Sequence, residues 1–273
     1  MVCRSFEYWL LLAIYFATRL VCGKLASGST PILLIVTHHK SGTVAARLLY
    51  EYITEKNNSY VFLLEDGLKS MWEDQLRLRH GKPFAIHVIR HPLDMLISGY
   101  NYHKACSEMA WTNCSVDKYG GTRRGNSRFP DFFPLKYNYC MKLQNMSLSS
   151  GLQAEMIRSL YAHDGIGFMF HNMNAFKRHL PVEHILNICL EDLHNDNSTT
   201  IDKLTQFLRP WNTFQKRVHI IDQIDHHSKA DANINAQLFY DMAWDIVKQN
   251  IHVNFLKTFP CSSRYKETLD LSW

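Results

Sequence analysis

Apolar runs alternate with amphipathic segments over most of the chain. Short runs rich in Ile, Leu and Val, bounded by turn-forming residues, predict strands buried on both faces of a sheet; they cover residues 31–36, 60–64, 84–89 and 185–190. Helical periodicity predicts helices over residues 44–53, 68–78, 150–163, 166–179, 199–208 and 233–250, and another that begins at Pro92. Strands that alternate with helices predict an α/β fold whose central, mostly parallel sheet is flanked by helices on both faces.

Composition indicates a globular protein. The chain has 273 residues, of which 46% are apolar and 20% charged, and this excludes a disordered, collagenous or coiled-coil polymer. No apolar run reaches the ~20 residues of a membrane span, which excludes a polytopic membrane protein. The formal charge of +5 suits an anionic ligand and is too small to indicate nucleic acid.

The first 23 residues resemble a sorting signal. Arg4 precedes an apolar stretch over residues 8–18, and Val21 and Gly23 occupy the −3 and −1 positions of a cleavage site. A signal peptide cleaved after Gly23, a short uncleaved membrane anchor and a buried N-terminal helix are the three interpretations. Four glycosylation sequons support the secretory pathway, with the Golgi lumen as the expected location; they begin at Asn57, Asn113, Asn145 and Asn197.

Five of the seven cysteines follow this leader, at positions 106, 114, 140, 189 and 261. Because five is odd, at least one thiol stays free or pairs between chains. Cys189 lies in an apolar run and is interpreted as a small buried hydrophobe. Cys106 and Cys114 flank a short polar loop and can close on each other, although the sequence leaves the connectivity open. The chain has no CxxC motif, which argues against redox chemistry. No pair of histidines lies at a zinc-site spacing beside the cysteines, so no structural metal is expected.

A polar turn with the sequence His-His-Lys-Ser-Gly-Thr, residues 38–43, follows the first predicted strand and opens a helix. Ligands of parallel sheets gather at this end of the strands, and a helix N-terminus offers N–H groups and partial positive charge to a phosphate. Gly42 lets the backbone approach such a ligand, and Lys40 adds a full charge. The turn is therefore a predicted anion site; an ordinary turn with a solvated lysine is the alternative.

A second candidate site begins where the third predicted strand ends. Arg90 supplies a planar guanidinium there, and Ser98 follows eight residues later, two turns into the next helix. A phosphate can be held between such a guanidinium and a hydroxyl. In the structural alternative, Arg90 pairs with Asp94 and Ser98 bonds to its own helix.

Together these segments resemble the sulfotransferases that use 3′-phosphoadenosine 5′-phosphosulfate (PAPS). Residues 40–43 are similar to the family's 5′-phosphosulfate loop, and residues 90–100 to its 3′-phosphate motif. The continuation over residues 100–104 is similar to secretory, carbohydrate-type members. Weaker similarities are the acidic pair Glu191-Asp192, interpreted as a structural cap, and the basic loop 226–229, for which a polar surface turn is the alternative.

The resemblance, which spans roughly residues 31–250, implies a three-layer sandwich of the P-loop type and one sulfotransferase domain over residues 31–260. It also implies transfer of a sulfuryl group from PAPS to an acceptor hydroxyl, expected on a carbohydrate, with no metal ion. Lys40 would neutralise charge on the leaving oxygen, and backbone N–H groups of residues 41–44 would hold the 5′-phosphate. The residues implied in PAPS binding are His39, Lys40, Ser41, Gly42, Thr43, Val44, Arg90, Ser98 and Lys229.

The general base that accepts the acceptor's proton is expected between the two motifs. Glu65 is the first choice because it follows an apolar strand, where burial would raise its pKa. His80 is the second choice because imidazole has a suitable pKa. Asp66 and Glu73 also lie between the motifs, whereas His38, His39 and His103 lie close to them and are further candidates; no motif decides among these residues.

The sequence leaves alternatives open for one loop and for the function as a whole. The basic residues of the loop 118–128 suit an acidic glycan or form a solvated charged surface, and Trp111 and Tyr119 suit sugar stacking or the core. A divergent P-loop kinase that uses ATP is the alternative enzyme. A catalytically degenerate sulfotransferase fold that binds glycans is the alternative without catalysis.

Overall fold

The computed structural model describes residues 31–56, 61–65, 83–106, 139–162, 164–194, 198–209 and 236–261. The predictions for the N-terminal leader, the helix over residues 68–78 and most of the two irregular stretches, 104–134 and 210–232, lie outside these ranges.

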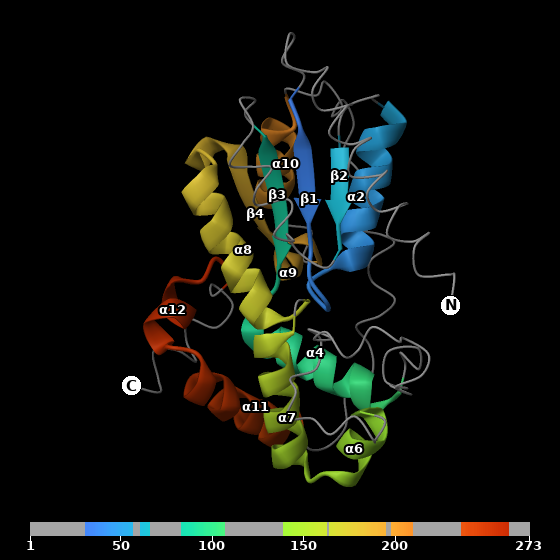
Figure 1. The fold of residues 1–273 in the computed structure, drawn as a ribbon. Helices are drawn as coiled ribbons and strands as arrows, with labels where there is room; N and C mark the ends of the chain where they lie inside the picture. Colours follow the sequence, from blue (N-terminus) through green and yellow to red (C-terminus); the bar gives the residue numbers. More distant parts are fainter. Residues whose placement is uncertain are drawn as a thin grey trace, which may run out of the picture.

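Four parallel strands form the sheet, as the apolar runs predict. They are β1 (Leu33–Val36), β2 (Val61–Leu64), β3 (Phe84–Ile89) and β4 (Ile185–Cys189), in the order β2-β1-β3-β4 (Figure 1). Leu33 of β1 is in register with Val61 and Phe84, so the first three strands begin at the same level of the sheet. The α/β class with a parallel sheet flanked by helices is confirmed.

Nine α-helices surround the sheet in the described ranges. The predicted ones are α2 (Thr43–Lys56), α4 (Pro92–Lys104), α7 (Leu148–Tyr161), α8 (Ile166–His179), α10 (Ser198–Phe207) and α11 (Ala236–Asn250). Three were not predicted because they are too short to show a period: α6 (Tyr139–Asn145), α9 (Leu190–His194) and α12 (Val253–Thr258). A 3₁₀ turn, Val182–His184, precedes β4. None of the helices in these ranges is long and apolar enough to cross a membrane.

Alternation along the strands places side chains in two cores. Leu33 and Ile35 of β1 pack with residues of α2, α9 and α10 on one face, whereas Leu34 and Val36 pack with Phe176 of α8 on the other. Figure 1 shows α8 on the opposite side of the sheet from α2 and α10.

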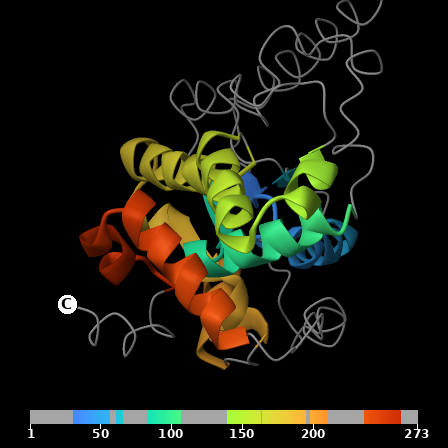
Figure 2. The same ribbon diagram turned by 90° about the horizontal axis from the view of Figure 1, so that it is seen from below.

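A third and larger core lies beyond the carboxyl end of the sheet. It joins α4, α6, α7, α11 and α12, and Tyr100, Leu152 and Val247 are among its buried residues. Figure 2, seen from that end, shows α4, α7 and α11 lying across the end of the sheet. The predicted ligand edge of the sheet therefore faces a group of helices.

Two disulfides correct the interpretation of the cysteines. Cys106 bonds to Cys140 rather than to Cys114. Cys189 is buried in the core, as interpreted, but is bonded to Cys261. Both bonds join residues far apart in the sequence, a contact that neither local pattern nor loop length reveals. Cys114 lies outside the described residues.

Candidate active site

The turn after β1 is organised around the hydroxyl of Ser41. This oxygen accepts the main-chain N–H of His38 at 2.7 Å and lies 3.0 Å from Thr37 Oγ1. It also lies 3.2 Å from the carbonyl oxygen of Val88 on β3, to which it can donate. Ser41 N–H donates to the His38 carbonyl at 3.0 Å. Ser41 therefore stabilises the turn through its hydroxyl and its N–H group. Because this N–H group is already hydrogen-bonded to His38, the expected phosphate contacts are those of the N–H groups of residues 42–44.

The backbone conformations of Lys40 and Gly42 determine the shape of the turn. Both have positive φ angles, 62° and 110°, which for lysine is an uncommon conformation. A β-carbon on Gly42 would lie 2.8 Å from Leu190 Cδ1 and 3.0 Å from Val88 Cγ1, so only glycine fits. Gly42 O accepts the N–H of Ala46 at 2.9 Å, which starts α2. The first-turn N–H groups of α2 have no acceptor within the helix and so suit an anion.

The two predicted motifs meet at this turn, at the carboxyl edge of the sheet (Figure 1). Arg90 Nη1 donates to the carbonyl oxygen of Lys40 at 3.1 Å. The Lys40 ammonium lies over the ring of Tyr102, with Nζ 2.7 Å from the ring centre. Tyr102 is one helical turn beyond the half-buried Ser98 on α4, so both lie on one face of that helix. Lys40, Arg90 and the Ser98 face of α4 therefore belong to one site.

Glu191 is a carboxylate that lies beside Arg90. Its Oε1 lies 3.5 Å from Arg90 Nε and accepts the main-chain N–H of His91 at 3.3 Å. Glu191, interpreted from the sequence as part of a structural cap, thus also lies within ion-pair distance of the guanidinium. Burial, and then the neighbouring charge of Asp94, raise the pKa of Glu191 to about 7. Glu191 is thus harder to ionise than an exposed carboxylate.

Glu65, the first choice for the general base, lacks the expected environment. Both its carboxylate oxygens accept hydrogen bonds from the Arg47 guanidinium, one at 2.7 Å. These hydrogen bonds lower the pKa of Glu65, whereas the sequence argument expected burial to raise it. The carboxylate is one third exposed and bound to an arginine, so the geometry does not favour it as a base. His80, Asp66, Glu73 and Lys229 lie outside the described residues.

His38 is equally unsuited to proton transfer with a substrate. It is fully buried, and its Nε2 lies 2.8 Å from Nε2 of His87, a second fully buried imidazole on β3. Asn172 and Phe168 of α8 lie against this pair. Burial lowers the pKa of His38 well below its ordinary value and that of His87 to about 3, so both imidazoles are neutral.

This pair makes the stability of the protein sensitive to acid. Below pH 6.5 these imidazoles become protonated in the unfolded chain but stay neutral in the folded chain. Their contribution to the free energy of unfolding is therefore fully present above pH 6.5 and decreases as the pH falls toward 3. Each imidazole is expected to lower the free energy of unfolding by about 1.4 kcal/mol per pH unit in this window. Urea unfolding at several pH values measures the slope. A His87→Gln variant should show a shallower decline, and an unchanged slope would contradict the assignment.

A buried charged cluster that sequence reasoning missed lies beside the turn. Glu155 of α7 accepts Tyr139 Oη at 2.8 Å and Arg158 Nε at 3.0 Å, and it lies 2.9 Å from His103 Nδ1. Arg158 Nη1 also lies 3.4 Å from Asp164 Oδ1. Burial alone would raise the pKa of Glu155, but the charges of Arg158 and His103 outweigh it and lower that pKa to about 2. The available signal was a Glu–Arg pair at i,i+3 spacing on the apolar face of α7.

His39 connects this cluster to the turn. Its main-chain N–H donates to the carbonyl oxygen of Asp164 at 2.8 Å. Its half-buried ring stacks on the ring of His103, with centroids 5.0 Å apart and planes 12° apart. The Tyr102 ring lies 5.9 Å from His39 in an edge contact. His39 and His103, both named from the sequence, are therefore beside Lys40.

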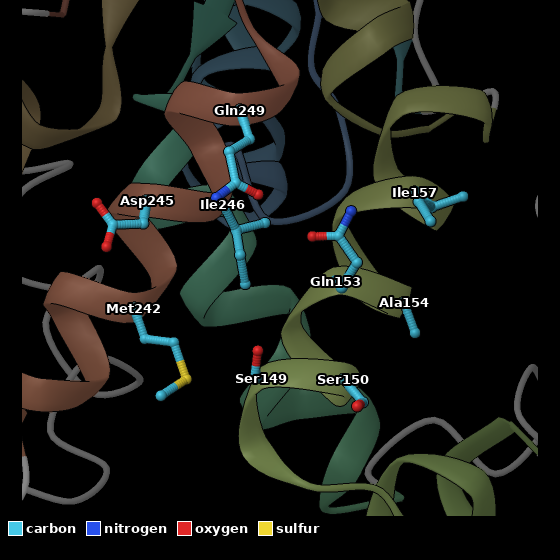
Figure 3. Close-up of a pocket in the computed structure, with 9 residues that line it drawn as sticks. All are labelled: Ser149, Ser150, Gln153, Ala154, Ile157, Met242, Asp245, Ile246 and Gln249. Atoms are coloured by element: carbon cyan, nitrogen blue, oxygen red, sulfur yellow. The ribbon is translucent and has the colours of Figure 1, made fainter.

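A pocket of about 580 Å³ lies elsewhere, between α7 and α11. Figure 3 shows the amide groups of Gln153 and Gln249 extending into the space between these helices. None of the predicted site residues lines it: the lining consists of Ser149, Ser150, Gln153, Ala154, Ile157, Met242, Asp245, Ile246 and Gln249.

One group of potential metal ligands occurs in the described ranges, formed by Cys189, Glu191 and Cys261. Its two sulfur atoms are bonded to each other in a disulfide, so they are not thiolate ligands. Comparison with known protein families and with curated protein sequences finds no match for this chain.

Proposed function

We propose that this protein transfers a sulfuryl group from PAPS to a hydroxyl of a carbohydrate acceptor, on a sandwich of the P-loop type. The single observation that carries the proposal is the hydrogen bond from Arg90 to the carbonyl of Lys40, at 3.1 Å. It brings together two motifs that are 50 residues apart in the sequence and that the resemblance assigns to opposite ends of one nucleotide. Because the motifs share a site, one ligand with two anionic groups can reach both.

The residues of the site fit the charges of PAPS. The N–H groups of residues 42–44 and the Lys40 ammonium suit the 5′-phosphosulfate, where negative charge builds on the leaving oxygen. The Arg90 guanidinium and the Ser98 hydroxyl suit the 3′-phosphate. Lys40 lies on the Tyr102 ring and has to turn from it toward the ligand. Transfer of this kind depends mainly on positioning and electrostatics, as phosphoryl transfer does.

Binding of the product nucleotide, 3′-phosphoadenosine 5′-phosphate (PAP), tests the donor site without any acceptor. We expect PAP to raise the melting temperature more than ADP does, because only PAP occupies both anion sites. Saturation at 100 times Kd corresponds to about 2.7 kcal/mol of stabilisation. Arg90→Ala should remove most of this shift. The matched control is Arg178→Ala, an exposed arginine on α8, which should keep it.

Transfer of labelled sulfate from PAPS to a panel of glycans, small phenols and peptides tests the activity. Lys40→Ala is expected to lower the transfer rate by about 10²–10³-fold, because it removes a charge that stabilises the leaving group. Lys177→Ala, an exposed lysine on α8, is the control. Phosphate transfer from ATP would favour the kinase alternative. Glycan binding with no transfer and no effect of Lys40→Ala would favour the degenerate fold.

A further inference from the structure

The base that accepts the acceptor's proton must touch the acceptor and lie close to Lys40. Of the described candidates, Glu65 is bound to Arg47, and His38 is fully buried against His87. His103 is only 3% exposed. His39 is half-buried, although its Nε2 atom is buried; it precedes Lys40 in the turn and makes an edge contact with the Tyr102 ring, which contacts the Lys40 ammonium. Its position next to Lys40 therefore favours His39 over the other described candidates.

We propose that His39 is the general base, and that Glu155 is a positioning residue that acts on it through His103; this rests on the proposed function. The acceptor O–H proton passes to the His39 imidazole while the acceptor oxygen bonds to sulfur. The bond between sulfur and the 5′-phosphate oxygen breaks, and its electron pair leaves with PAP. Lys40 stabilises the charge that develops on that oxygen.

The positioning part follows from how the two rings are held. A carboxylate only accepts hydrogen bonds, so His103 Nδ1, at 2.9 Å from Glu155, carries the proton of this contact. That hydrogen bond orients the His103 ring, and the stacked His39 ring follows its plane. Tyr139 and Arg158 hold the same carboxylate in place. Gly99 permits the approach, because a β-carbon there would lie 2.8 Å from Glu155 Oε1.

His39→Ala tests the catalytic part. With PAPS and the panel acceptor that gives the highest rate, we expect transfer to fall by about 10²-fold or more. Added imidazole should restore part of the lost rate, which a purely structural or PAPS-binding role would not allow. Transfer at the wild-type rate, or a loss that imidazole does not restore, would overturn the assignment. Absence of transfer by the unaltered protein would instead contradict the proposed function.

Glu155→Gln tests the positioning part, with Asp245→Asn on α11 as the control carboxylate-to-amide change. ¹⁵N NMR of the histidine rings in the full chain, without any ligand, should show His103 protonated at Nδ1. In E155Q this preference should be lost, the His39 signals should move, and kcat should fall about tenfold with KM little changed. Unchanged His39 signals and kcat would overturn the role of Glu155. The H39A result does not depend on the folding of E155Q.

Discussion

Replacing Arg158 with methionine is expected to lower the free energy of unfolding by about 3–5 kcal/mol. The guanidinium is 4% exposed and lies between Glu155 and Asp164. Without it, the Glu155 carboxylate stays in a buried site and loses the cation that stabilises its charge most. The same loss should raise the pKa of Glu155, which Arg158 now lowers to about 2 by its charge.

Chemical unfolding of R158M beside an Arg178→Met variant measures this effect. Arg178 is an exposed arginine on α8, so its replacement should change stability by no more than about 0.5 kcal/mol. A loss of less than 1 kcal/mol in R158M would mean that solvent or another cation neutralises Glu155, and the described cluster would then be wrong.

Removing the Cys189–Cys261 disulfide is the other large expected change. The bond spans 72 residues, and constraint of the unfolded chain by a loop of this size corresponds to about 4 kcal/mol. A double variant, Cys189→Ala with Cys261→Ala, is therefore expected to lose about 2–4 kcal/mol. Because Cys189 directly precedes Leu190 and Glu191, which contact Gly42 and Arg90, the shift with PAP should also become smaller.

The Cys106–Cys140 pair supplies the matched comparison. It spans 34 residues, so its removal should cost about 0.6 kcal/mol less in the same entropic account. Mass spectrometry of peptides from the unreduced protein checks the connectivity directly. A peptide that links Cys114 to any of these four cysteines would contradict the pairing on which both predictions depend.

The strands and long helices were predictable because their signals are local. The run Pro31–Val36 is apolar throughout because both faces of β1 are covered, and Pro92 marks the first turn of α4 as it does in many helices. Lys40 and Arg90 were also found locally, each at the end of an apolar strand. A parallel sheet was expected to place both at the same edge, but their closeness follows from the pairing of β1 with β3, which the sequence did not predict.

The remaining features depend on contacts between distant segments. The environment of Glu65 is set by its hydrogen bonds from Arg47 on α2. The disulfide of Cys189 is formed with Cys261, near the end of the described chain. The Glu155 cluster combines residues from α4, α6 and α7, and only the Glu155–Arg158 pair within α7 has a local sequence signal. A residue's pKa depends on what surrounds it, and the sequence of its own segment contains no record of those neighbours.

By itself, the sequence determined the order and type of the main elements and placed Lys40, Gly42 and Arg90 at the ends of inner strands. These follow from hydrophobic periodicity and turn chemistry, which act between near neighbours in the chain. Only the tertiary structure decided that His103 stacks on His39, that Glu191 lies beside Arg90 and which cysteines are bonded. Those outcomes depend on side chains from separate helices meeting in space, and packing rather than local pattern brings them together.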